Sequence, residues 1–258
     1  MAKTVIAAQL YTVREFTKTP EDFAQTLQKV RQIGYQAVQL SGHGPIEAKE
    51  IKKSLKAAGL VCCATHVKTD QFTDALDQLI AEHQLWKCKF PGIGGFFKAP
   101  ATAQDFIDFA KKFDPIGAKL REQGMSFLYH NHHHEFTKYE GKLAIEHLMD
   151  NSSGENVTFE LDTHWVQRGG GDPAAWIAKA AARGPIPVLH LKDMTISPVD
   201  KSPMFAEVGE GNLNWPSILK AAKKAKVRWY VVEQDKCERD PFESLAISYR
   251  NLTSWGLK

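Results

Sequence analysis

The stretch VTFELDTHW, residues 157–165, shows the pattern from which the fold of this chain can be inferred. It begins with β-branched and aromatic residues, which favour a short buried strand over residues 157–161. The polar residues Asp162 and His164 follow at once. Because side chains alternate along a strand, Asp162 points away from the face that carries Leu161. The stretch therefore predicts a buried strand that ends in chemically active side chains.

Similar apolar runs occur throughout the 258 residues, and each is followed by a longer amphipathic segment. The apolar runs predict strands at residues 5–10, 37–40, 60–66, 86–90, 125–130, 157–161, 187–191 and 229–232. The amphipathic segments predict helices at residues 20–33, 46–58, 70–84, 102–123, 143–150, 172–182, 215–225 and 241–252. The run at 86–90 is the weakest of the predicted strands.

Alternating strand–helix units predict a parallel sheet with right-handed crossovers. Eight units in about 250 residues favour closure, so we expect an α/β fold, a (β/α)8 TIM barrel that forms one domain over residues 1–258. The competing fold is an open doubly wound sheet, which usually carries a glycine-rich phosphate turn after its first strand. The corresponding segment here is Gln9-Leu10-Tyr11-Thr12, which contains no glycine.

Composition narrows the classes of partner. The net charge is +3 and the basic residues are scattered, so we expect no nucleic-acid partner. We expect no membrane partner and a cytoplasmic location, because neither a run of about 18 apolar residues nor a signal-peptide pattern is present. The four cysteines, Cys62, Cys63, Cys88 and Cys237, form no CxxC pair, which indicates neither a disulfide framework nor a thiolate zinc site.

Histidines and carboxylates gather where the predicted strands end, which is where TIM-barrel active sites form. Seven of the ten histidines lie at these ends: His66, His130, His132, His133, His134, His164 and His190. Several also have a structural explanation. His133 and His134 fit a solvated loop, His66 fits a hydrogen-bonded barrel histidine, and Glu160 fits a buried structural partner.

Alternation selects the side chains that share the inner face. His130 shares its face with His132, and His190 lies between two leucines, so it points inward together with Lys192. Imidazoles and carboxylates from four strands around one axis predict one divalent metal ion: Mn, Zn, Co, Fe or Mg. The predicted ligands are His130, Asp162, His190 and Glu233. The ligand after residues 125–130 stays open between His130, His132 and Glu135.

At these residues the sequence resembles the sugar phosphate isomerase/epimerase family, also called xylose isomerase-like TIM barrels. The resemblance spans almost the whole chain, and the order of its short motifs makes it specific. The motifs are Gln9-Leu10-Tyr11-Thr12-Val13-Arg14, Tyr129-His130-Asn131-His132 with Glu135-Phe136, Leu161-Asp162-Thr163-His164-Trp165-Val166, Gly169-Gly170-Gly171-Asp172-Pro173, His190-Leu191-Lys192-Asp193, Val208-Gly209-Glu210-Gly211 and Val231-Val232-Glu233-Gln234-Asp235.

The resemblance implies a metal held by residues from the fifth to eighth strands, and Asp162, His190 and Glu233 match three of its ligands. Many relatives have a glutamate where this chain has His130. In the family's epimerases two glutamates face each other across the substrate and exchange its proton, so this departure puts the two-carboxylate scheme in doubt. Glu233 with His132, or with Glu135, must then supply the acid–base pair.

Further side chains are expected to bind the substrate. We expect Lys192 to stabilise an oxyanion or to bind a phosphate or hydroxyl group. Tyr11 and Trp165 offer apolar faces for a sugar ring, and Glu210 lies in a glycine-flanked loop that could close over the site. The complete expected substrate-binding set is Tyr11, Arg14, His66, His164, Trp165 and Glu210.

The leading functional hypothesis is a metal-dependent isomerase or epimerase of a small sugar, keto-sugar or polyol, acting by proton abstraction next to a carbonyl. A metal-dependent lyase or dehydratase of a keto-sugar or inosose is the main alternative, because both reactions begin with that proton. A non-catalytic metal-binding barrel is less favoured. A phosphodiester nuclease would need more metals and a basic groove. The aromatic residues Phe96, Phe97 and Trp215 could serve a homo-oligomer.

Overall fold

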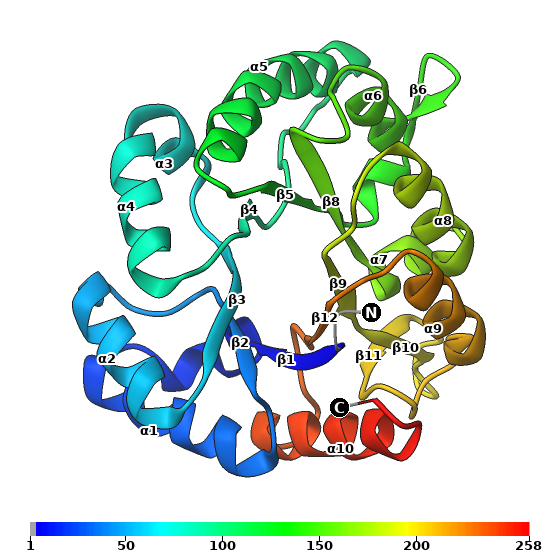
Figure 1. The fold of residues 1–258 in the computed structure, drawn as a ribbon. Coiled ribbons are helices and arrows are strands. Elements are labelled where there is room, and N and C mark those ends of the chain that lie inside the picture. Colours follow the sequence, from blue (N-terminus) through cyan, green and yellow to red (C-terminus); the bar gives the residue numbers. More distant parts are fainter. Residues whose placement is uncertain (1–3, 258) are drawn as a thin grey trace.

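Eight parallel strands form a closed barrel in the computed structural model, which describes residues 4–257 (Figure 1). Around the barrel the strand order is β1-β12-β9-β8-β5-β4-β3-β2. These strands are β1 (Val5–Gln9), β2 (Ala37–Leu40), β3 (Val61–His66), β4 (Pro91–Ile93), β5 (Phe127–His130), β8 (Val157–Asp162), β9 (Val188–Leu191) and β12 (Trp229–Val232). The predicted (β/α)8 barrel is confirmed.

Helices surround the barrel on its outside (Figure 1). They are α1 (Pro20–Ile33), α2 (Ala48–Ala58), α3 (Thr69–Asp74), α4 (Leu76–Trp86), α5 (Ala103–Glu122), α6 (Ala144–Asp150), α7 (Thr163–Arg168), α8 (Pro173–Arg183), α9 (Trp215–Lys224) and α10 (Pro241–Ser254). Side chains of Thr19, Asp172, Asn214 and Asp240 cap α1, α8, α9 and α10, each followed by a proline in the first turn. In the described part of the chain, no helix combines the length and apolar character needed to span a bilayer.

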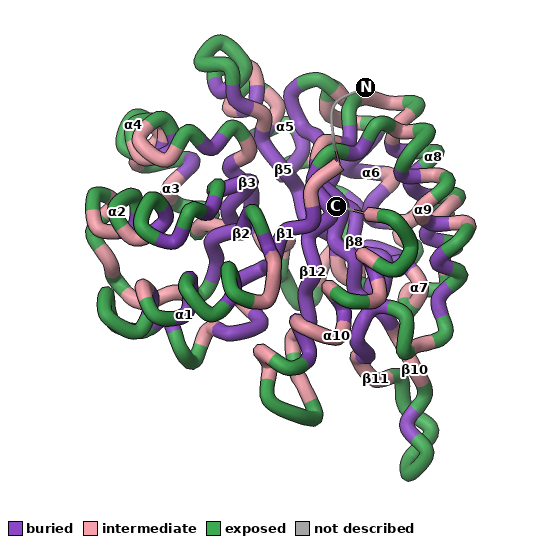
Figure 2. Tube along the Cα trace, turned by 60° about the horizontal axis from the view of Figure 1, so that its bottom comes forward, coloured by how far each residue is buried: buried purple, intermediate pink, exposed green. Residues whose placement is uncertain are grey.

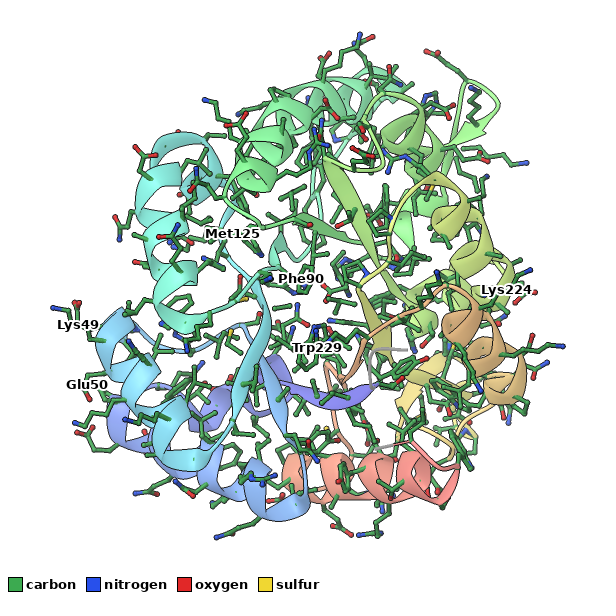
Figure 3. The ribbon with its side chains drawn as sticks, in the orientation of Figure 1. Lys49, Glu50, Phe90, Met125, Lys224 and Trp229 are labelled. Atoms are coloured by element: carbon green, nitrogen blue, oxygen red, sulfur yellow. The ribbon has the colours of Figure 1, made fainter. Side chains whose placement is uncertain are left out.

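The core has two layers. The larger layer lies between strands and helices, so the strands are buried while the helices expose their outer faces (Figure 2). The smaller layer fills the interior of the barrel with residues such as Ala7, Ala64 and Val231. Phe90 and Trp229 lie within the ring of strands, whereas Lys49 and the other labelled charged residues lie outside it (Figure 3). The inner layer forms the base beneath the polar residues at the strand ends.

The predicted fourth strand is wrong. Residues 86–90 do not form a strand, because Trp86 ends helix α4 and donates its indole N–H to the carbonyl of Ala48 at 2.9 Å. Lys87 then adopts a left-handed conformation with φ 57°, and the strand forms at Pro91–Ile93. The predicted helix over 70–84 is also divided, since Ala75 has non-helical angles between α3 and α4.

Several short helices and hairpins lie outside the barrel strands and are not predicted from the sequence. They are the 3-10 helices η1 (Leu10–Phe16) and η2 (His134–Phe136), helix α7, and the hairpins β6 (Lys138–Tyr139)–β7 (Lys142–Leu143) and β10 (Asp193–Ile196)–β11 (Pro203–Ala206). They lack the length over which a hydrophobic period becomes visible.

The buried carboxylate of Asp193 organises the chain between β9 and α9. It accepts hydrogen bonds from the backbone N–H groups of Gly209, Gly211 and Leu213 at 2.9–3.2 Å, and from the indole N–H of Trp215 at 2.6 Å. A Cβ at Gly211 would lie 2.3 Å from Asp193 Oδ1, so this position requires glycine. One carboxylate thereby fixes a whole connecting loop.

We expect acid to destabilise the protein partly through His83. This buried side chain is hydrogen-bonded to Thr65 Oγ1 and the Leu79 carbonyl, and burial lowers its pKa to about 4. The unfolded-state pKa is about 6.5, so the contribution to stability is complete above that pH and is lost as the pH falls towards 4. Urea unfolding at pH 7.5 and 5.0 should show a drop about 2 kcal/mol larger in wild type than in His83→Gln. Equal drops in the two proteins would contradict this.

Candidate metal centre and its pocket

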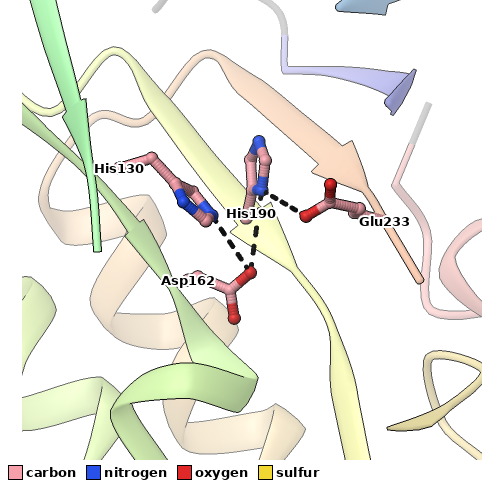
Figure 4. A group of neighbouring side chains, drawn as sticks. All are labelled: His130, Asp162, His190 and Glu233. Atoms are coloured by element: carbon pink, nitrogen blue, oxygen red, sulfur yellow. Dashed lines mark hydrogen bonds and ion pairs between the residues drawn. The ribbon is translucent and has the colours of Figure 1, made fainter. Parts of the chain in front are cut away.

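Four strands of the barrel bring His130, Asp162, His190 and Glu233 together. One ligand atom from each lies within 4.8 Å of all the others, and all four side chains are buried (Figure 4). His130 Nε2 lies 3.3 Å from Asp162 Oδ2, and His190 Nδ1 lies 3.7 Å from the same oxygen. His190 Nδ1 is also 3.1 Å from Glu233 Oε2. We call these residues the four-donor cluster.

Asp162 is held by local structure in a position that suits a ligand. Its Oδ1 accepts a hydrogen bond from the backbone N–H of Trp165 at 2.9 Å and so caps helix α7. The backbone N–H of Asp162 donates a hydrogen bond to Asn131 Oδ1 at 3.1 Å. The other oxygen, Oδ2, faces His130 and His190. The helix N-terminus thus fixes the carboxylate with one oxygen free for the cluster.

A second layer of polar residues orients His190 from the other side of its ring. His190 Nε2 donates to Gln39 Oε1 at 2.7 Å, and the Gln39 amide in turn donates to Glu160 Oε2 at 3.2 Å. His66 Nε2 donates to Glu160 Oε2 at 2.5 Å. Because the Gln39 oxygen can only accept, Nε2 of His190 carries a hydrogen and Nδ1 is directed at the four-donor cluster.

Electrostatics show that the cluster favours positive charge. Burial by itself lowers the pKa of His190, but Glu160 and Glu233 raise it well above its ordinary value. Burial raises the pKa of Asp162, yet the neighbouring Lys192 and His130 hold it well below its ordinary value. Carboxylates this deeply buried need a compensating cation.

Replacing Glu160 with Gln is expected to destabilise the protein by about 2–4 kcal/mol, because it removes the buried anion between His66 and His190. Urea denaturation at pH 7.5 measures the effect. The matched control is Glu155→Gln, which removes an exposed partner of Arg121 and should cost less than about 1 kcal/mol. A Glu160→Gln protein as stable as the control would show that this second layer contributes nothing.

Lys192 places an ammonium group beside the cluster. Its Nζ lies 3.0 Å from Asp162 Oδ2, 2.7 Å from Glu233 Oε2 and 2.6 Å from Asp235 Oδ2, and the side chain is fully buried. Burial alone lowers its pKa, but the three carboxylates raise the pKa above the ordinary value of a lysine. The three carboxylates therefore favour the charged form of Lys192.

His132 lies at the wall of the pocket as a neutral imidazole. Burial, together with His130 and Lys192, lowers its pKa to about 2. Its Nδ1 has no hydrogen-bond partner among residues 4–257. The surroundings therefore keep the His132 ring neutral and leave one of its nitrogens unengaged.

Glu135 turns into the protein instead. Its carboxylate accepts hydrogen bonds from the Tyr129 hydroxyl at 2.7 Å and from the His132 backbone N–H at 2.8 Å. The side chain is fully buried and serves to fix the loop that carries His132. The structure therefore places Glu135 outside the four-donor cluster.

A cavity of about 1110 Å³ opens onto the cluster. Its lining includes Tyr11, His66, His130, His132, Glu233 and Asp235. The cavity also extends over Lys68 and Asp70, and Trp86 lines it as well. The space is large enough for a sugar-sized molecule to reach the four-donor cluster.

Three other expected substrate-binding residues are not among those that line this cavity: Arg14, His164 and Trp165. Trp165 backs His132, with 5.0 Å between ring centroids. His164 is buried with Nδ1 3.1 Å from the Asp193 carbonyl. Arg14 stacks over Tyr11 and donates to the Asp235 carbonyl.

Glu210 is not brought to the cluster. It is exposed on the outer surface and accepts a hydrogen bond from Asn251 of α10 at 2.8 Å.

Two residues of the site, Asp235 and Gln39, are not predicted from the sequence as site residues. Glu160 is predicted only as a buried structural partner. Asp235 is two residues beyond Glu233, and Glu160 is two residues before Asp162. A period of two places each on the same face as a predicted ligand. This alternation could have identified Asp235 and Glu160 as site residues.

The residues present fit a divalent cation. Two imidazoles and two carboxylates from separate strands form a mixed nitrogen–oxygen set of the kind that Mn, Fe, Co and Zn accept. The ammonium of Lys192 lies against two of the same carboxylates, so this group of side chains accommodates positive charge.

The fold agrees with the comparison to known proteins. The chain belongs to the xylose isomerase-like TIM barrel family, whose model matches residues 27–250. It is 24% identical over 262 aligned positions to the rhizopine catabolism protein MocC of Rhizobium meliloti, covering 88% of this chain and 78% of that protein. It is 22% identical to the inosose dehydratase of Bacillus cereus (strain AH820), with 86% and 85% covered.

Solved structures show the same fold. A sugar phosphate isomerase/epimerase from Parabacteroides distasonis ATCC 8503 superposes with a TM-score of 0.80 at 22% identity, covering 96% of this chain and 97% of that one. The relatives and neighbours of this chain thus include enzymes, among them a dehydratase and an isomerase/epimerase.

Proposed function

We propose that this chain is a divalent-metal-dependent isomerase or epimerase of a small keto-sugar or polyol-derived ketone. The reaction begins with removal of a proton from the carbon next to the carbonyl. The observation that carries the proposal is the arrangement of the His132 imidazole in the wall of the cavity and of the buried Lys192 ammonium beside Asp162 and Glu233 of the four-donor cluster.

His130, Asp162, His190 and Glu233 would hold the metal ion. When bound, a divalent cation polarises a carbonyl and stabilises the negative charge that develops on its oxygen. Holding these four side chains in place is the task of the second layer around Glu160 and of the α7 cap on Asp162.

His132 is the proposed base. Its neutral ring lines the cavity, so it would take the substrate proton and return it to the neighbouring carbon in an isomerisation. An epimerisation would need a second group, Glu233, to give a proton to the opposite face. Lys192 donates a hydrogen bond to a substrate oxygen as negative charge develops there. Tyr11 and His66 line the cavity and are placed to contact hydroxyl groups or the ring face.

A dehydratase is the second candidate. The similarity to an inosose dehydratase over 86% of this chain favours it, because that enzyme's name identifies both a ring ketone substrate and loss of water. The first step is the same proton removal. The reactions then differ in whether the proton returns to carbon or a hydroxyl group on the adjacent carbon leaves as water.

The test is incubation of the Mn²⁺- or Co²⁺-loaded protein with a panel of ketoses and inososes in D₂O. Deuterium entering next to the carbonyl, observed by NMR, supports proton abstraction. A new isomer that differs in mass from the substrate only by the exchanged deuterium identifies an isomerase or epimerase, whereas an ultraviolet-absorbing enone identifies a dehydratase. Bound metal with no exchange on any substrate would leave a non-catalytic metal-binding barrel.

A further inference from the structure

The ammonium of Lys192 occupies the same carboxylate oxygens that face the centre of the four-donor cluster. Asp162 Oδ2 is the oxygen nearest His130, at 3.3 Å, and it is also the one 3.0 Å from Lys192 Nζ. Glu233 Oε2 is 3.1 Å from His190 Nδ1 and 2.7 Å from Lys192 Nζ. A metal ion and this ammonium would therefore bind the same two oxygens, Asp162 Oδ2 and Glu233 Oε2.

Simultaneous binding of a metal ion and the Lys192 ammonium to these two oxygens is unfavourable. A divalent ion binds carboxylate oxygens at about 2.0–2.2 Å, which would place it close to an ammonium that donates to the same atoms. Like charges this near repel strongly in a buried site, where water screens them little. The ammonium must therefore withdraw from Asp162 and Glu233 when a metal binds.

Asp235 provides the place to which the ammonium withdraws. Its Oδ2 is 2.6 Å from Lys192 Nζ, the shortest of the three contacts, and it does not belong to the four-donor cluster. Its side chain is 26% exposed, so it lies on the solvent side of the buried pair. Arg14 donates to the Asp235 backbone carbonyl at 3.1 Å and fixes this segment. The aromatic rings of Trp165 and Phe205 flank the ammonium at 5.2 and 5.6 Å from their centroids.

We propose that Lys192 is a tethered counter-cation that holds Asp162 and Glu233 in place in the metal-free protein and competes with the metal for them, and that Asp235 draws Lys192 away when the metal binds. This inference rests on the metal centre proposed above. It makes Lys192 and Asp235 opposing determinants of metal affinity. A purely structural role for either residue would not give effects of opposite sign.

The experiment measures Mn²⁺ affinity by calorimetry on chelator-stripped protein. Lys192→Met removes the competing charge and is expected to tighten Mn²⁺ binding about tenfold or more. Asp235→Asn removes the alternative partner and is expected to weaken binding about tenfold. The exposed ion pair Lys142–Asp150, 2.8 Å apart, supplies matched controls, since Lys142→Met and Asp150→Asn should leave the affinity unchanged.

Stability of the same variants gives a second measurement. Metal-free Lys192→Met should unfold at lower urea than wild type, because two buried carboxylates lose their cation, and saturating Mn²⁺ should stabilise it more than it stabilises wild type. If Lys192→Met does not fold, Lys192→Gln takes its place, because it also removes the competing charge while its amide can still donate to the buried carboxylates.

The outcomes separate this inference from the proposed function. Wild type that binds Mn²⁺ while the folded variants bind it equally, or with the signs reversed, overturns the competition and leaves the metal centre standing. Mn²⁺ binding by Lys192→Met alone supports the competition and shows that the ammonium replaces the metal in the natural chain. Absence of binding in every protein overturns both the metal centre and the competition.

Discussion

Asp162→Asn is expected to lower metal affinity more than about 100-fold while the barrel stays folded. Asp162 Oδ2 is the oxygen shared by His130 and His190, so an amide there removes a charged ligand from the centre of the set. Loss of a residue that only supports a ligand already costs about 10–100-fold in metal affinity. Elemental analysis of the purified protein should find about one metal per wild-type chain and almost none in the variant.

The choice of Asn separates the two roles of this side chain. Asn retains an oxygen that can accept from the Trp165 backbone N–H, so the cap on α7 survives. Asp172→Asn is the matched control, because Asp172 caps α8 through Ala174 on the outer surface. We expect that control to keep its full metal content. An Asp162→Asn protein that retained metal at wild-type levels would refute the proposed site.

His132→Gln is expected to lower the rate of proton exchange and turnover by about 10²–10⁴-fold, the usual contribution of a general base. The metal content should stay unchanged, because His132 lies outside the four-donor cluster. Deuterium incorporation followed by NMR gives the rate on whichever ketone substrate the panel identifies.

The neighbouring His133 supplies the control for this change. It is exposed and its ring also stacks on Trp165, at 5.2 Å between ring centroids. His133→Gln should therefore keep nearly full activity. Comparable losses in both variants would show that the loop, and not the imidazole of His132, is what the reaction requires.

The barrel follows from hydrophobic pattern because its strands are buried on both faces and bounded by polar ends. Seven of the eight strands are predicted to within two residues at either end. The exception, β4, has only three residues, Pro91–Ile93, preceded by a run whose Trp86 and Phe90 imitate a strand. Three residues carry too little periodicity to compete with such a run.

Site residues are predictable from the sequence only where they lie in a regular strand or directly follow one. Alternation places His130, Asp162, His190 and Glu233 on the inner face, and the structure brings these four together. Glu135 lies in the single-turn 3-10 helix η2 and Glu210 in a loop, where no period tells whether a carboxylate faces the pocket, the core or solvent. Their surroundings depend on contacts with Tyr129 and Asn251, which are set by tertiary packing.

The two polar residues that follow β9, Lys192 and Asp193, have separate roles. Lys192 turns to the donor cluster, while Asp193 turns away and gathers the backbone of the segment that leads to α9. The loop is thus clamped from outside the pocket and shares no ligand with it. The segment between β11 and α9 is consequently held in place independently of what occupies the pocket. Substitutions among the pocket residues should leave its shape unchanged, provided that Asp193 and the glycine at 211 are kept.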